Sequence, residues 1–194
     1  MSVMTASRTE LPDDRPLTVA DLDLLPDDGN RYELDDGVLV VSPAPALSHQ
    51  FVLHRLSIVL EQARSDDFLV LPGPGVEMTK YQYRIPDLVV VRIESVGFED
   101  LSVTKPPVLA IEIASPSTAI YDTNRKKDVY AGFGIASYWI VKPSLDQPSV
   151  TAFELRRGRY REVACVTGDE VFRATRPFGV DIVPAALVAG PWQR

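Results

Sequence analysis

Two acidic residues occupy positions where a carboxylate needs a partner. Glu112 interrupts the apolar run at 108–113, and Asp87 directly precedes the run Leu-Val-Val-Val at 88–91. Burying an unpaired carboxylate is costly, so each side chain needs a proton, a cationic partner or a metal ion. Two carboxylates, a strand carbonyl and water molecules form an oxygen-rich site of the kind that Mg²⁺ or Mn²⁺ prefers. The alternative is a structural ion pair with an arginine.

A lysine favours the site over the ion pair. The pattern at 122–133 predicts a helix, and its buried stripe comprises Val129, Tyr130 and Phe133. At about 100° per residue, Lys126 lies at the centre of this stripe. Its ammonium group would reach Glu112, although the long side chain could also extend to solvent. Asp122 lies one turn earlier, where we expect a helix cap or a weak (i, i+4) pair with Lys126.

The elements that must position these residues follow from the hydrophobic pattern. We expect a strand at 107–113, a helix at 122–133 and a strand at 137–141, which together form a crossover unit with parallel strands. The segment 85–91 also reads as a strand. If it pairs with the strand of Glu112, the two carboxylates come together.

Further elements surround this unit. Asp35-Asp36-Gly37 is a turn sequence between β-prone runs, which predicts a hairpin of strands 31–34 and 38–42 with Glu33 on the first strand. Apolar residues at helical spacing predict a long helix at 46–64, with His49 on its apolar side. Before the hairpin, Thr18 and Asp21 have capping-box spacing and predict a short helix.

The composition sets limits on the protein class. The chain has 194 residues, of which 45% are hydrophobic and 24% charged, so we expect a polar, flexible leader at 1–17 and a single domain at 18–194. No run is long enough to span a bilayer and the N-terminal segment has no apolar core, which predicts a cytoplasmic protein without membrane contact. One cysteine and two histidines exclude a closed zinc site.

The charge is unevenly distributed. The net charge is −7, which argues against a nonspecific nucleic-acid coat. Residues 1–48 hold three Arg and ten Asp or Glu, whereas the remainder is balanced at seventeen of each sign. The larger part of the chain is therefore compatible with a polyanionic partner.

At this point the residues resemble a known family, the Uma-type restriction endonucleases of the PD-(D/E)XK nuclease superfamily. The resemblance covers about residues 18–188, and its segments are 31–43, 48–50, 86–91, 112–118, Asp122 through Lys126 to Tyr130, and 138–141, followed by the run that ends at Leu187. Each segment is weak alone, but their order is specific.

The resemblance implies an α/β fold in which a mixed sheet is flanked by helices, with an N-terminal hairpin. It further implies that Asp87 and Glu112 are metal ligands, assisted by the Ile113 carbonyl, and that Glu33 completes the metal shell. The superfamily's usual lysine is replaced by Ala114 here, so Lys126 is its expected substitute on the helix. His49 becomes a candidate for a phosphate or water contact, and the alternative is a histidine whose hydrogen bonds are satisfied at the start of its helix.

The implied function is a Mg²⁺- or Mn²⁺-dependent endonuclease acting on DNA, and cutting both strands requires two sites, which predicts a homodimer. One alternative is a catalytically inactive nuclease fold kept as a DNA-binding or assembly module, in which the acidic residues merely pair. Against it, two carboxylates would repel DNA unless a cation intervened. A carboxylate-pair glycosidase is a third possibility that nothing in the strand pattern favours.

Overall fold

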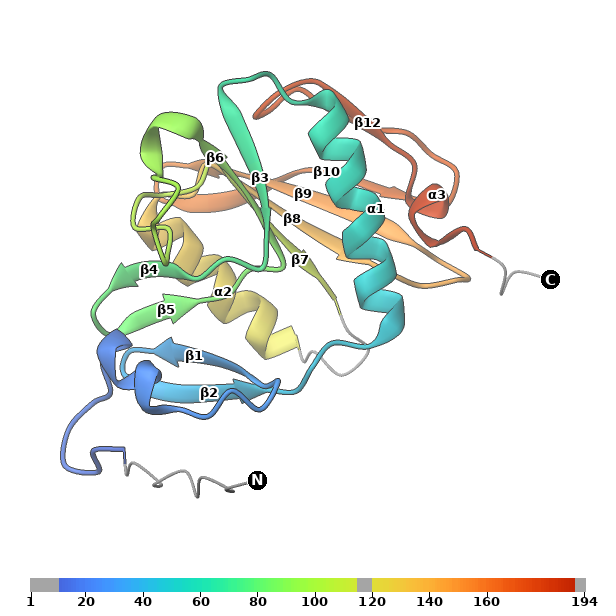
Figure 1. Ribbon diagram of the computed structural model, residues 1–194. Coiled ribbons are helices and arrows are strands. Elements are labelled where there is room, and N and C mark those ends of the chain that lie inside the picture. The colour runs from blue at the N-terminus through green and yellow to red at the C-terminus, as the bar shows by residue number, and fades with distance from the viewer. Residues whose placement is uncertain (1–10, 115–119, 191–194) are drawn as a thin grey trace.

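The computed structural model describes residues 11–114 and 120–190. Figure 1 shows a large sheet with helices on both faces and a smaller sheet beside it. In chain order the elements are η1 (Val19–Leu24), β1 (Arg31–Asp35), β2 (Val38–Ser42), α1 (Leu47–Ala63), β3 (Phe68–Pro72), β4 (Val76–Thr79), β5 (Gln82–Arg84), β6 (Leu88–Arg92), η2 (Ile93–Ser95), β7 (Leu109–Ile113), α2 (Ile120–Phe133), β8 (Ser137–Lys142), β9 (Ser149–Arg156), β10 (Arg159–Thr167), β11 (Phe172–Ala174), β12 (Val180–Ile182) and α3 (Pro184–Val188).

The large sheet is mixed. Its six strands run in the order β10-β9-β8-β7-β6-β3. β7 and β8 pair in parallel across the α2 crossover, and the other neighbours pair antiparallel. The predicted strand-helix-strand unit is therefore confirmed, and β6 and β7 lie inside the sheet.

Side-chain alternation on β6 and β7 divides the core between the two faces. Leu88 and Val90 pack in the cluster that includes α1, α3 and β12, whereas Val89 and Val91 pack in the cluster that includes Tyr130 of α2. On β7, Ala110 also faces the α2 side. Because successive strand residues point to opposite faces, Glu112 shares the side of Ala110 and faces α2.

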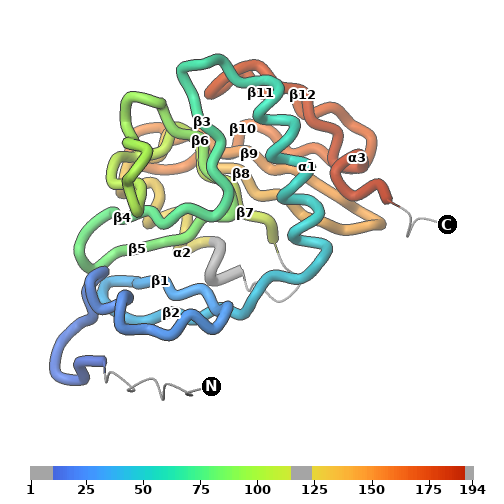
Figure 2. The backbone as a smooth tube through the Cα atoms, viewed as in Figure 1, coloured from blue at the N-terminus to red at the C-terminus, as the bar shows by residue number. Residues whose placement is uncertain are grey.

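The smaller sheet has the order β2-β1-β5-β4. Its β1–β2 hairpin is confirmed, and both Asp36 (φ 51°) and Gly37 (φ 80°) adopt the left-handed conformation that this two-residue turn requires. The chain around the start of η1 contacts the two turns at one end of this sheet, because Leu17 N–H donates to the Gly37 carbonyl (2.9 Å) and Val19 N–H to the Lys80 carbonyl (2.9 Å). Figure 2 shows this N-terminal segment beside β1 and β2.

The predicted start of the strand at 85–91 was wrong. β5 ends at Arg84 in the smaller sheet and β6 begins at Leu88 in the large sheet, so residues 85–87 connect the two sheets. Pro86 has no N–H to donate to a ladder, which explains the break. Asp87 consequently lies at the junction of the sheets.

At the two ends of the chain the structure adds detail. β11, β12 and α3 pack near α1, and the sequence pattern did not indicate them. Arg15 and Leu17 already contact the body, whereas residues 1–10 of the predicted leader lie outside the described part. Within the described residues, no helix is both long and apolar enough to cross a membrane.

Candidate active site

Asp87 is buried, with 3% of its surface exposed, and three groups hold it. Arg31 Nη1 donates to Oδ1 (2.6 Å), while the Ile113 backbone N–H donates to Oδ2 (2.8 Å) and His49 Nε2 lies 2.9 Å from the same oxygen. Burial alone would raise the pKa of Asp87, but the hydrogen bond and charge of His49, together with the bonds from Arg31 and Ile113, hold it below its ordinary value. The carboxylate is ionised and fixed.

Glu112 projects from β7 toward α2. Lys126 Nζ lies 3.0 Å from Oε2, and the buried Tyr130 hydroxyl donates to Oε1 (2.6 Å). Burial raises the pKa of Glu112 to about 7; the charge of Lys126 opposes this shift, the charges of Asp87 and Glu33 add to it, and the Tyr130 bond opposes it. A second positive charge at this point would therefore stabilise the ionised form.

Glu33 reaches the same region from β1. The Ile85 N–H donates to its Oε1 (2.7 Å), and Arg84 Nη1 lies 3.6 Å from its Oε2, beyond hydrogen-bond range. Arg84 is itself buried, with 2% exposed, and its Nη2 lies 2.9 Å from Asp35 Oδ1. This buried arginine of β5 therefore places positive charge near the carboxylates of Glu33 and Asp35.

The structure brings the expected residues together. Asp87 is bonded to the backbone of Ile113, the neighbour of Glu112, because Leu88 pairs with Ile111 in the antiparallel β6–β7 ladder. Lys126 contacts Glu112 as its helical position predicted. The segment 115–119 of the family pattern lies outside the described residues, as does the side chain of Asp122.

Three contributions were missing from the sequence interpretation. Arg31 was noted only as part of a matching segment, Tyr130 only for its buried stripe and its matching segment, and Ile113 only for its carbonyl. The tyrosine carried a usable signal, because a buried hydroxyl needs a hydrogen-bond partner and Tyr130 lies one turn after Lys126. The Arg31 contact joins residues 56 positions apart, which no local pattern reveals.

The donor set of the site fits a hard divalent cation. Each ionised carboxylate oxygen accepts two hydrogen bonds, so Asp87 Oδ1 and both Glu112 oxygens keep one acceptor position beyond the contacts above. Among the described residues, no group of three or more His, Cys, Asp or Glu side chains is arranged to hold a metal ion. The geometry therefore offers two carboxylates and leaves the remaining ligands to backbone and water oxygens.

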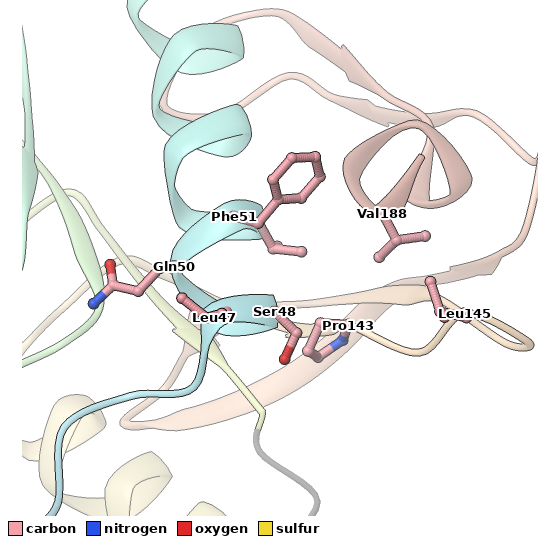
Figure 3. Close-up of a pocket in the computed structure, with 8 residues that line it drawn as sticks. Leu47, Ser48, Gln50, Phe51, Pro143, Leu145 and Val188 are labelled. Carbon is pink, nitrogen blue, oxygen red and sulfur yellow. The ribbon is translucent and has the colours of Figure 1, made fainter. Parts of the chain in front are cut away.

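An apolar cavity of 610 Å³ lies beside the start of α1. Figure 3 shows Phe51, Leu145 and Val188 around it, with Ser48 and Pro143 below them. None of the candidate site residues lines this cavity, and its lining is mainly apolar, with no acidic side chain and no histidine. The cavity is therefore separate from the carboxylate cluster.

Comparisons with known proteins identify a family and a fold. The chain matches the family Uma2, described as "Putative restriction endonuclease", over residues 19–186. It is similar to the crystal structure of a protein from Anabaena variabilis described as a "putative nuclease belonging to DUF820", with 14% identity, a TM-score of 0.69, and coverage of 89% of this chain and 98% of that one. At this identity the likeness concerns the fold, and it confirms the predicted mixed α/β architecture. No curated protein matches the chain.

Proposed function

This chain belongs to the Uma2 family of restriction-endonuclease-like proteins, and on that premise we propose that it is a metal-dependent endonuclease that hydrolyses phosphodiester bonds in DNA. The family supports nuclease activity in general. The metal, the DNA substrate and the homodimer are our own additions to it.

One observation carries the proposal: the buried Asp87 carboxylate hydrogen-bonds to the backbone of β7, and the partly buried Glu112 carboxylate on that strand contacts the ammonium group of Lys126 from the next helix. A fold needs no such arrangement for stability, since buried ion pairs contribute little net free energy. Phosphodiester cleavage does need it, because the phosphate is anionic and the transition state gains charge.

The chain's own residues have distinct roles in this proposal. Asp87, Glu112 and the Ile113 carbonyl would hold Mg²⁺ or Mn²⁺, with Glu33 beside them. Such a cation supplies positive charge against the phosphate and lowers the pKa of a water molecule.

Lys126 orients the attacking water or offsets charge on the phosphate, and Tyr130 fixes the Glu112 carboxylate from the opposite oxygen. His49 is buried against Asp87, so we assign it the positioning of that carboxylate.

A noncatalytic module is the second candidate, and one contact favours it. Arg31 pairs with Asp87 at 2.6 Å, which is the structural ion pair that would satisfy a buried carboxylate without any metal. Lys126 could satisfy Glu112 in the same manner. The two functions therefore differ in whether these carboxylates bind a cation.

Plasmid cleavage separates the two functions. Purified protein is incubated with supercoiled plasmid and Mg²⁺ or Mn²⁺, alongside Asp87→Ala, Glu112→Ala and Lys126→Ala. We expect the wild-type protein to cleave only with metal and each variant to lose about 100-fold or more in rate, because each removes a cation ligand or a transition-state charge. His54→Ala, at an exposed position of α1, is the matched surface control and should cleave normally.

Equal residual cleavage by all these proteins would indicate a contaminating nuclease and reject the site. Absence of cleavage by folded wild-type protein, together with unchanged DNA binding in Asp87→Ala, would support the noncatalytic module instead. Circular dichroism of each variant shows that a lost activity does not reflect a lost fold.

A further inference from the structure

Arg31 is the most exposed of the side chains that meet at Asp87. Its side chain is 26% exposed, compared with 9% for His49 and 5% for Asp87 itself. It is the first residue of β1 in the smaller sheet, whereas Asp87 leads into β6 of the large sheet. Arg31 therefore covers the solvent side of the buried carboxylate.

The guanidinium group uses little of its hydrogen-bonding capacity. Nη1 donates to Asp87 Oδ1, and within the ranges 11–114 and 120–190 this is the one hydrogen bond that the Arg31 side chain makes. A guanidinium carries five N–H donors in a planar fork that matches a phosphate group. Since the side chain is partly exposed, donors remain for an anion that approaches from solvent.

The same contact conflicts with cation binding. Asp87 Oδ1 is the oxygen that keeps an acceptor position, because Oδ2 already meets Ile113 N–H and His49. A divalent cation on Oδ1 would lie close to the guanidinium, and like charges near a buried carboxylate repel strongly. The other two partners do not conflict, because one is a neutral amide and the other lies on Oδ2.

We propose that Arg31 is a catalytic phosphate-binding residue that Asp87 holds in the resting site. The inference rests on the proposed function, since it takes the substrate to be a phosphodiester and Asp87 to be a cation ligand. In the resting protein Arg31 neutralises Asp87. With a cation held by Asp87, the guanidinium would be released to donate to a non-bridging oxygen of the scissile phosphate, where it would offset developing charge.

This role predicts opposite effects on metal binding and on cleavage. Arg31→Met removes a competitor for Asp87, so Mn²⁺ should bind about tenfold more tightly. The same variant lacks the phosphate contact, so cleavage at saturating Mn²⁺ should fall about 100-fold. If Arg31 only held Asp87 in place, Arg31→Met would weaken Mn²⁺ binding, because the Asp87 carboxylate would lose its fixed position.

Arg64→Met is the matched control. Arg64 also pairs with a carboxylate at 2.6 Å, to Glu61, and its side chain is 24% exposed. Arg64 follows the last residue of α1, whereas His49 lies in the first turn of this helix. The substitution therefore removes the same charge far from the site. Both its Mn²⁺ affinity and its cleavage rate should equal those of the wild-type protein.

The decisive measurement is the affinity for Mn²⁺ without DNA, which electron paramagnetic resonance detects. Single-turnover cleavage is the second readout. If wild-type protein and Asp87→Asn bind Mn²⁺ equally, the proposed metal site fails. If only the wild-type protein binds and Arg31→Met binds no more tightly, the proposed function stands and the Arg31 inference is overturned. Should Arg31→Met not fold, Arg31→Lys serves, with a smaller gain in affinity and a cleavage loss of about tenfold, because an ammonium lacks the planar fork.

Discussion

At the scale of single residues, Glu112 is the clearest case of a side chain that its surroundings hold between two states. Burial favours its protonated form, whereas Lys126 and Tyr130 favour the carboxylate, and its pKa of about 7 reflects this balance. Tyr130 is fully buried and also packs edge-on against Tyr138 at 5.4 Å between ring centroids. The tyrosine thus connects the site to the aromatic core beneath α2.

The substitution Tyr130→Phe tests this connection. It removes the hydroxyl at 2.6 Å from Glu112 while keeping the ring, so we expect a loss of about 1–2 kcal/mol in unfolding free energy and of about tenfold in cleavage rate. Denaturant unfolding and plasmid cleavage measure the two effects.

Tyr160→Phe is the control for that substitution, because its hydroxyl donates to the Ile135 carbonyl (2.8 Å) away from the site. It should cost about 1 kcal/mol or less and leave cleavage unchanged. Equal losses of activity in both variants would mean that Tyr130 acts only through stability.

At the scale of elements, the segment around η1 is hydrogen-bonded to the smaller sheet, and this sheet carries Arg31 and Glu33. Asp21 organises it: Arg15 donates to both Asp21 oxygens at 2.8 Å, and the Thr18 N–H and hydroxyl donate at 2.7 Å each. The hydrogen bonds from Arg15, and then those from Thr18, hold the pKa of Asp21 well below its ordinary value. The predicted capping box is therefore confirmed and gains a second partner.

This low pKa predicts an acid-sensitive contribution to stability. A carboxyl whose pKa is depressed by folding stabilises the folded state above its unfolded pKa of about 3.9, and that contribution is lost as the pH falls below this value. We expect Asp21→Asn to lower the Tm by a few degrees at neutral pH, and the difference from wild type to shrink below about pH 4.

Thermal unfolding of both proteins between neutral and acidic pH checks this expectation. Asp23→Asn removes the same charge from an exposed position of the same helix and should change the Tm little at any pH. A constant difference between Asp21→Asn and wild type across the pH range would contradict the ionic origin of the effect.

At the scale of the whole molecule, the site lies where the two sheets and two helices meet. The smaller sheet provides Arg31 and Glu33, the connection between sheets provides Asp87, β7 provides Glu112, and the helices provide His49 and Lys126. Any relative movement of the sheets would separate Arg31 from Asp87.

The described part of the chain brings together one such candidate site, so cutting both strands of a duplex would require two chains. We expect sedimentation analysis to give twice the 21.4 kDa mass of the chain, and linear plasmid to appear without a long-lived nicked form. A monomer that accumulates nicked plasmid would contradict the homodimer while leaving the site intact.

The sequence by itself determined the elements that local patterns encode and the residue types of the site. The apolar run around Glu112, the crossover helix with Lys126 on its inner face and the Asp35-Asp36-Gly37 hairpin are all readable, because period-2 and period-3.6 patterns are local properties. The family resemblance added the order of these segments.

Only the tertiary structure decided which charges meet. The start of β6 after Pro86 depends on its pairing with β3 and β7, and the three C-terminal elements pack near α1, which lies far from them in the sequence. The same holds for the contact of Arg31 with Asp87, 56 positions apart, and for the burial that raises the pKa of Glu112. Electrostatic interactions depend on distance and burial in space, and neither follows from separation along the chain.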